Sequence, residues 1–301
     1  MYIAALLVGG IYSNLYHGKT GTVANTMANS MESTFITLAE HSIYLRCRLN
    51  AKQSPTATLF LSPFAEEMNK SRHLSAQLMN ALFQQGQDSF LPDPFGTGDS
   101  SADLDSASAA LWRQDLLLLI QLLKDRGYQS LNLLASRYGA LQLIDLLATE
   151  ALPLPVNKIL LWQPYLQSST FLQQFFRLKI AEQMATGNKT TQKELEYQLS
   201  TGEVVEIAGY PITQNFVSSI YALKDVTALP ALYQQTPLLW LETSMLPNIS
   251  PVCEKGMGLL SQYFAAEFAQ LQGPAWWNAT ELVQSPELIA RSVEFLTGKT
   301  A

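Results

Sequence analysis

A short turn near the middle of the chain carries the residues best suited to do chemistry. The stretch LNLLASRYGALQL, residues 131–143, has an apolar run, a small residue and two polar residues, then Gly-Ala before a second apolar run. This pattern is typical of a strand, a tight turn and a helix. In enzymes with a nucleophile elbow the turn is G-x-S-x-G, and the central serine is the nucleophile. Here the turn Ala135-Ser136-Arg137-Tyr138-Gly139 has arginine at its centre.

Steric fit indicates which residue occupies the apex of this turn. The strained geometry requires small residues two places before and two places after the apex. Around Arg137 these positions hold Ala135 and Gly139. Around Ser136 they hold leucine and tyrosine, which are both bulky. We therefore expect Arg137 at the apex and Ser136 turned aside, which makes Ser136 a poor candidate for a nucleophile.

The other two members of a serine-hydrolase triad also lack good candidates. In hydrolases with this turn the acid and then the histidine follow the serine in the chain. All histidines of the sequence precede it: His17, His41 and His73. Trp276 stands at the usual histidine position, and Glu242 is the carboxylate nearest to the usual acid position. A Ser-His-Asp mechanism is therefore close to excluded.

Arg137 is suited to a different task. A guanidinium stays protonated and donates hydrogen bonds, but it has no nucleophilic lone pair. Near a helix N-terminus it can bind a carboxylate, phosphate or sulfate, helped by the backbone N–H groups of Phe64 and Tyr138. The alternative is a structural arginine neutralised by a carboxylate, because an unpaired buried charge is costly. The candidate partners are Glu66, Glu67, Asp93, Asp99 and Glu242.

The segment SPFAEEMNKSR, residues 62–72, offers further polar groups. If a helix begins near Glu66, its acidic first turn favours the helix dipole, and Glu66 and Lys70 form an i,i+4 pair. The alternative is a cleft in which Glu66, Glu67 and Asp99 act as acid or base groups around Arg137. The residues that would line it as binding groups are Asn69, Lys70 and Asp93.

Neither a metal nor a cofactor is expected. The acidic residues of this region have no metal-ligand spacing. The loop FGTGDS, residues 95–100, lacks the lysine of a P-loop and the full dinucleotide-binding pattern, so it reads as a turn at a strand end.

Aromatic residues also fall at the ends of predicted strands. Trp162 and Gln163 end one strand and would face the cleft or the segment above it, together with Trp276. Aromatic residues at such places are more often part of the core. A tryptophan-lined cleft with polar ends would suit a sugar or an acyl chain.

Strands and helices alternate from residue 33 onward. The strands are predicted at 33–39, 42–49, 56–64, from 88, 130–135, 158–166, 237–244 and 269–277. The helices between and after them are predicted at 66–86, 107–127, 139–150, 256–268 and 285–298. This alternation predicts a mostly parallel sheet covered on both faces, with the site at the carboxyl ends of the strands.

The alternation is interrupted at residues 167–228, which have an amphipathic helix, a polar stretch, a predicted β-ribbon and a short helix. An insertion of this length with its own elements predicts a cap over the site. The core would then comprise 31–166 and 229–301. Residues 1–30 are predicted to be a loose tail, or to precede a natural start at Met27 or Met31.

Composition excludes several classes of function. The formal net charge is −6 with 19 basic residues among 301, which disfavours a nucleic-acid-binding surface. The apolar stretch MYIAALLVGGIY is too short to span a bilayer, so no integral membrane segment is expected. Two distant cysteines, Cys47 and Cys253, predict reduced thiols in a cytoplasmic protein.

The order of elements resembles the α/β-hydrolase fold with a cap between its sixth and seventh strands. The blocks SPFAEEMNKSR, PDPFGTGDS, LLWQPYL and GEVVEIAGY, with the arginine-centred turn, resemble the bacterial family called exosortase A system-associated hydrolase 2. This resemblance implies a role beside exopolysaccharide biosynthesis and the exosortase machinery for PEP-CTERM proteins. The family's hydrolase label derives from its fold and carries little chemical information.

Two functions follow as hypotheses. The first is a hydrolase of an acyl or glycosyl substrate that works without a standard triad, with Arg137 at its centre. The second is a catalytically inactive hydrolase-fold module that binds an anionic ligand or a partner protein of the exopolysaccharide and exosortase system. A filled pocket with Arg137 in an ion pair would favour the second.

Overall fold

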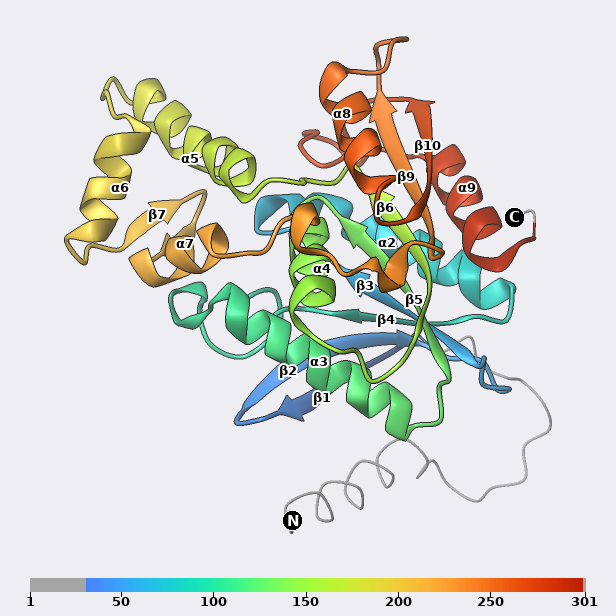
Figure 1. Cartoon of the computed structure of the whole chain (residues 1–301). Coiled ribbons are helices and arrows are strands. Elements are labelled where there is room, and N and C mark those ends of the chain that lie inside the picture. The colour runs from blue at the N-terminus through green and yellow to red at the C-terminus, as the bar shows by residue number, and fades with distance from the viewer. Residues whose placement is uncertain (1–30, 300–301) are drawn as a thin grey trace. The chain divides into compact units, whose positions relative to one another are not determined.

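The computed structural model describes residues 31–299, and the predicted tail at 1–30 lies outside them. The main sheet of the described residues has eight strands in the order β1-β2-β4-β3-β5-β6-β9-β10 (Figure 1). The strands are β1 (Met31–Leu38), β2 (His41–Arg48), β3 (Thr56–Leu61), β4 (Asp88–Pro92), β5 (Ser130–Ser136), β6 (Val156–Trp162), β9 (Pro237–Ser244) and β10 (Ala265–Gln272). β2 is antiparallel to both neighbours and the other pairs are parallel, which confirms the predicted mostly parallel sheet.

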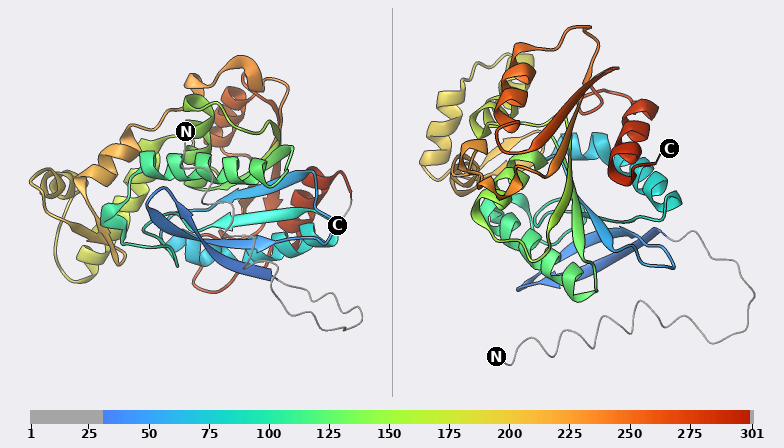
Figure 2. Two further views of the ribbon diagram at one scale, coloured as in Figure 1. Left: turned by 90° about the horizontal axis from the view of Figure 1, so that it is seen from below. Right: turned by 45° about the vertical axis from the view of Figure 1, so that its right-hand side comes forward.

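Helices cover both faces of this sheet. On one face lie α2 (Glu66–Gln84) and α9 (Pro286–Thr297). On the other lie α3 (Ala109–Asp125), α4 (Gly139–Thr149) and α8 (Pro251–Leu260). The right-hand view of Figure 2 shows the two groups of helices on either side of the strands.

The side chains of the central strands alternate between the two helical layers. Leu133 of β5 packs with the α3 and α4 layer, whereas the next residue, Leu134, packs with α2 and α9. Both leucines are completely buried or nearly so. This period of two is the one that a strand covered on both faces requires. Burying each such leucine contributes about 1.5–3 kcal/mol to the hydrophobic stabilisation.

Several element boundaries differ from the sequence prediction: β3 and β6 end at Leu61 and Trp162 rather than at 64 and 166, and β10 lies four to five residues before the predicted 269–277. The helix predicted at 256–268 is instead α8, Pro251–Leu260, and β10 begins already at Ala265. The cause is a strong start signal, because Ser250 caps the helix by accepting a hydrogen bond from the Cys253 N–H at 3.2 Å. Proline follows Ser250 at the first helical position, where its missing N–H is harmless.

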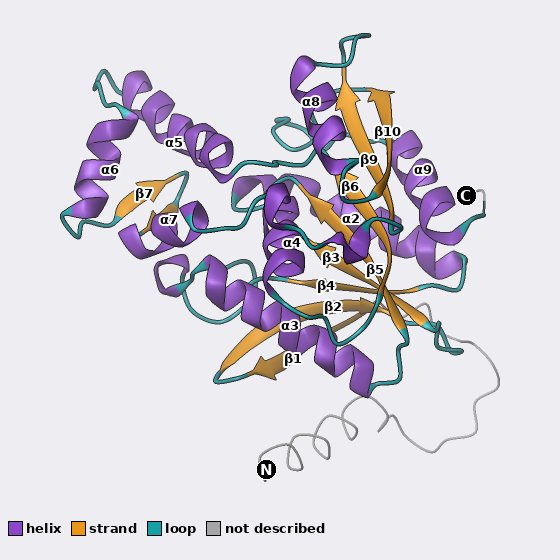
Figure 3. Cartoon of the chain, viewed as in Figure 1, coloured by secondary structure: helices purple, strands orange, loops and turns teal. Residues whose placement is uncertain are grey.

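The chain between β6 and β9 forms a group of small elements. They are α5 (Ser168–Ala185), α6 (Gln192–Ser200), the ribbon β7 (Val205–Ile207) and β8 (Tyr210–Ile212), α7 (Gln214–Tyr221), and the 3₁₀ turns η2 (Val226–Ala228) and η3 (Ala231–Tyr233). Figure 3 shows these helices gathered beside the sheet. We call residues 168–221 the insertion. Its interpretation as a cap stays a prediction.

Three further properties concern the described residues as a whole. Within 31–299, no helix has the length and apolar character needed to cross a membrane. In the same range, no group of three or more histidine, cysteine or acidic side chains is arranged to hold a metal ion. Cys47 and Cys253 are both unpaired and buried.

Candidate functional site

The turn between β5 and α4 has the backbone of a nucleophile elbow with Arg137 at its apex. Arg137 has a φ of 52°, in the left-handed region that costs a non-glycine residue about 1–2 kcal/mol. Its N–H donates to the Trp162 carbonyl at 3.0 Å, which ties the turn to β6. A Cβ at Gly139 would lie 2.1 Å from the Leu61 carbonyl oxygen, so only glycine fits there. Ser136 is 2% exposed and is buried beneath the turn.

The Arg137 side chain is held by an ion pair with Glu67, one of five candidate partners. Its Nη2 lies 2.8 Å from Glu67 Oε1, and its Nε lies 3.2 Å from both carboxylate oxygens. Nη2 also donates to the Tyr165 hydroxyl at 2.6 Å, and Nη1 donates to the Gln163 carbonyl at 3.3 Å. Every guanidinium nitrogen therefore has a partner within the protein. The side chain is 10% exposed.

Two aromatic rings pack against the same guanidinium. Its Cζ lies 4.2 Å from the centre of the Tyr165 ring and 4.5 Å from the centre of the Trp277 ring. At these distances the ring quadrupole attracts the cation. Burial raises the pKa of the Tyr165 hydroxyl to about 12, and the negative charge of Glu67 adds to the rise. Tyr165 therefore acts as a neutral hydrogen-bonding partner of Arg137.

Trp162 and Trp276, for which the sequence left open a place in the core or in the cleft, lie in the core. Trp162 is fully buried and donates from its Nε1 to the Ser292 hydroxyl of α9 at 2.9 Å. Trp276 is 1% exposed and packs edge-on against Trp162, with ring centres 6.1 Å apart. The side chains of a strand alternate between its two faces, and the Trp162 side chain lies on the face that packs against α9. Trp277, the next residue along from Trp276, contacts Arg137.

Glu242 and Gln163 form the second polar pair at this edge of the sheet. The Gln163 amide donates to Glu242 Oε1, and its own oxygen accepts from the Thr243 N–H at 2.8 Å. Glu242 Oε2 accepts from Trp240 Nε1 at 2.7 Å. Burial raises the pKa of the Glu242 carboxyl, while its bond from Trp240 and the charge of Arg137 oppose the rise. Both oxygens of this carboxyl are thus engaged.

Glu66, Asn69 and Lys70 lie on the first turns of α2, which begins at Glu66 as the sequence indicates. The Lys70 Nζ is 3.9 Å from Glu66 Oε1, and the Glu66 side chain is half exposed. The Asn69 amide donates to Glu66 at 3.3 Å and to the Tyr210 hydroxyl of the insertion at 3.2 Å. These residues form a solvated rim that joins α2 to the insertion.

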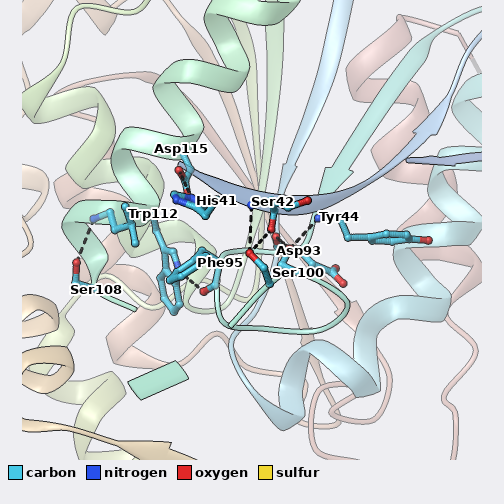
Figure 4. A network of polar contacts seen from close by, with 11 residues as sticks. His41, Ser42, Tyr44, Asp93, Phe95, Ser100, Ser108, Trp112 and Asp115 are labelled. Carbon is cyan, nitrogen blue, oxygen red and sulfur yellow. Dashed lines mark hydrogen bonds and ion pairs between the residues drawn. The ribbon is translucent and has the colours of Figure 1, made fainter. Parts of the chain in front are cut away.

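Asp93 and Asp99 are not among the partners of Arg137. Asp93 is 2% exposed, and its Oδ2 accepts from Arg72 Nη2 at 2.7 Å and from the Asp99 N–H at 3.0 Å. The Asp93 carbonyl accepts from the Ser100 hydroxyl at 2.6 Å (Figure 4). The expected single cluster is therefore divided, because Arg72 pairs with Asp93 while Arg137 pairs with Glu67.

A further polar pair, which the sequence did not reveal, joins the start of β2 to α3. His41 Nε2 lies 2.8 Å from Asp115 Oδ1, and the His41 ring packs on Phe95 with centres 4.4 Å apart (Figure 4). Burial raises the pKa of Asp115, against the effect of His41. A cavity of about 20 Å³ adjoins Asp115 and Gln142, which is room for one water molecule. Residues 74 positions apart in sequence give no local signal of such a contact.

The aromatic residue Phe64 is the centre of a ring cluster between the core and the insertion. It is 4% exposed. The rings in contact with it are those of Trp112, Tyr138, Phe171, Phe175, Tyr210 and Phe216. Phe171, Phe175, Tyr210 and Phe216 come from the insertion. Side chains thus fill the volume beside the elbow.

The two histidines within 31–299 are bonded away from the elbow. His41 is paired with Asp115, and His73 Nε2 lies 2.6 Å from the Val283 carbonyl oxygen. His17 lies outside the described residues. Arg137 and Glu242 thus have no histidine partner among the residues that the structure describes.

Comparison with known proteins shows the fold. No protein-family model and no curated protein matches the sequence. Among solved structures, the chain is similar to Est1E of Butyrivibrio proteoclasticus with bound ferulic acid, at 13% identity over 88% of this chain and 98% of that one, with a TM-score of 0.60. Haloalkane dehalogenase DbeA of Bradyrhizobium elkani is similar at 17% identity over 89% and 98%, with a TM-score of 0.56. Proline iminopeptidase of Mycobacterium smegmatis is similar at 14% identity over 89% and 98%, with a TM-score of 0.55. The chain has the α/β-hydrolase fold, as expected.

Proposed function

We propose that this protein is a non-catalytic α/β-hydrolase-fold module that binds an anionic group of its ligand through Arg137. The observation that carries the proposal is the position of Arg137 at the apex of the elbow, in an ion pair with Glu67 at 2.8 Å. A guanidinium cannot attack a carbonyl carbon, but its planar set of donors suits carboxylates and phosphates.

The surroundings of the elbow support binding over hydrolysis. A serine hydrolase needs a histidine beside its nucleophile and an acid that orients the histidine. Glu242 lies at the end of β9, but its oxygens accept from Gln163 and Trp240. The ring cluster around Phe64 occupies space that an acyl chain would need.

The hydrolase of an acyl or glycosyl substrate is the second candidate. It would use Glu66, Glu67 or Asp99 as an acid or base. Glu67 is held by Arg137, and both Glu66 and Asp99 are exposed to solvent and do not pair with Arg137. These observations favour the binding module over the hydrolase. From the resemblance in sequence we propose a cytoplasmic setting beside exopolysaccharide and exosortase systems, with a ligand or partner protein from that setting.

The test is a panel of short acyl p-nitrophenyl esters, thioesters and glycosides, together with a fluorophosphonate probe that labels reactive serines. We expect neither turnover above the buffer rate nor labelling in the wild type, in Ser136→Ala or in Arg137→Ala. Turnover that is lost in Ser136→Ala and kept in Arg137→Ala would make this a serine hydrolase and overturn the proposal. Glycoside turnover lost in Glu66→Gln would support the second candidate.

A further inference from the structure

We propose that Glu67 is a built-in competitor for the Arg137 site and that the ligand which displaces it is a carboxylate. This inference rests on the proposed function and adds the class of ligand and a means of control. Glu67 already presents to Arg137 the group that such a ligand would bring.

The contact between the two residues has the form of ligand recognition. Both Glu67 oxygens lie 3.2 Å from Nε, and Oε1 lies 2.8 Å from Nη2, so the carboxylate meets the Nε–Nη2 edge of the guanidinium. The Tyr165 hydroxyl, 2.6 Å from Nη2, stands beside the same edge. Edge-on contact of this kind is how arginine recognises a free carboxylate.

The remaining sides of the guanidinium are occupied. The rings of Tyr165 and Trp277 pack against it, and Nη1 donates to the Gln163 carbonyl. An anion that pairs edge-on with Nε and Nη2 must therefore take the edge that Glu67 holds. Binding must be an exchange in which the Glu67 side chain leaves.

Glu67 is placed so that it can leave without unfolding α2. Its side chain is 23% exposed, and it belongs to the first turn of the helix. The next residue, Met68, is 3% exposed and anchors that turn in the core. A change of side-chain rotamer would bring the Glu67 carboxylate into water, and the incoming carboxylate would replace it as the partner of the buried Arg137.

Charge favours a carboxylate over a phosphate. A monoanion that replaces Glu67 on Arg137 restores the balance of charge that the ion pair had. A dianion adds a second negative charge beside the displaced Glu67, and like charges repel. The site therefore selects the planar monoanion.

The experiment compares Glu67→Gln with Glu66→Gln by isothermal titration at constant ionic strength. The two variants lose the same charge from neighbouring positions, but Glu66 pairs with Lys70 and not with Arg137. The probes share one ring: benzoate, the neutral benzamide and phenylphosphonate. We expect Glu67→Gln to bind benzoate about tenfold more tightly than the wild type. Glu66→Gln should stay within about twofold of the wild type, and benzamide should not bind.

Each outcome separates the two proposals. Equal benzoate affinity in the wild type and both variants would leave anion binding in place and overturn the role of Glu67. Preference of Glu67→Gln for phenylphosphonate would overturn the carboxylate class. Absence of benzoate and phenylphosphonate binding in every variant, including Glu67→Ala, would overturn the proposed function as well. Tyr165→Phe, which keeps the ring and removes the hydroxyl, should weaken benzoate binding to Glu67→Gln if the Arg137 edge is the site.

Discussion

The α-carbon of Gly139 lies against the carbonyl of Leu61, so close that a Cβ would be 2.1 Å from the oxygen. This contact lets α4 start directly beside β3 and holds Arg137 at the apex. The same steric demand identified the apex from sequence alone.

Gly139→Ala should be strongly destabilising. The new Cβ would clash with backbone atoms of Leu61 and Ser62, which cannot move aside as the end of a flexible side chain can. We therefore expect a loss of about 3 kcal/mol or more in the free energy of unfolding. Urea denaturation measures it. The matched control is Gly258→Ala on α8, where a Cβ meets nothing within 4 Å. That change should stabilise by about 1 kcal/mol, and equal losses in the two variants would contradict the steric account.

Arg137→Ser should create a serine at the apex without creating an esterase. The described residues place no histidine beside it, so the hydroxyl lacks the base that serine hydrolases use to remove its proton. Hydrolysis of p-nitrophenyl acetate by the variant should stay at the buffer rate. A burst of p-nitrophenol equal to the enzyme concentration would show that a base is present and would refute this prediction.

The pKa of Glu242 gives a prediction for stability against pH. Burial raises it in the folded state, while the unfolded value is about 4.3. A raised carboxyl pKa adds stability that is fully present below the unfolded pKa and is lost as pH rises through the folded one. Between about pH 4 and pH 7, Glu242→Gln should therefore lose less stability than the wild type does.

Urea denaturation across this pH range measures that difference. The exposed Glu254→Gln on α8 serves as the control with the same loss of charge and should follow the wild type. If the free energy of unfolding of Glu242→Gln fell with pH as steeply as that of the wild type, the raised pKa would not belong to Glu242.

His41 and Asp115 should be energetically coupled. Their side chains are 14% and 7% exposed, and His41→Ala leaves the Asp115 carboxylate buried without its partner. We expect a loss of about 3 kcal/mol, falling to about 1 kcal/mol when Asp115→Asn is already present. A double-mutant cycle in urea measures the coupling. If His41→Ala costs the same in both backgrounds, the contact contributes nothing specific.

Much of the fold could be predicted because its signals are local. Alternating strands and helices gave the sheet, and glycines at 86 and 127, both with positive φ, follow the ends of α2 and α3. The polar stretch predicted within the insertion contains the helix α6, Gln192–Ser200. Thr191 and Glu194 form a capping box that was visible as T-x-x-E.

The site was harder to predict because its contacts are not local. The need for small flanking residues placed Arg137 at the apex, but five carboxylates competed as its partner. Glu67 lies 70 positions away, and its selection depends on how α2 meets the sheet. Trp276 and Trp277 lie in a loop without periodicity, so no sequence pattern indicates which of them contacts Arg137 and which lies in the core.

The ring cluster around Phe64 links two properties that an engineer would want to vary independently. Phe171 and Phe216 attach the insertion by packing on Phe64, and the same rings occupy the space beside the elbow. Truncating Phe64 to open a pocket would also remove part of the packing that attaches the insertion to the core. A larger pocket beside the elbow therefore requires new contacts between the insertion and the core, because the rings that fill this space also hold the two together.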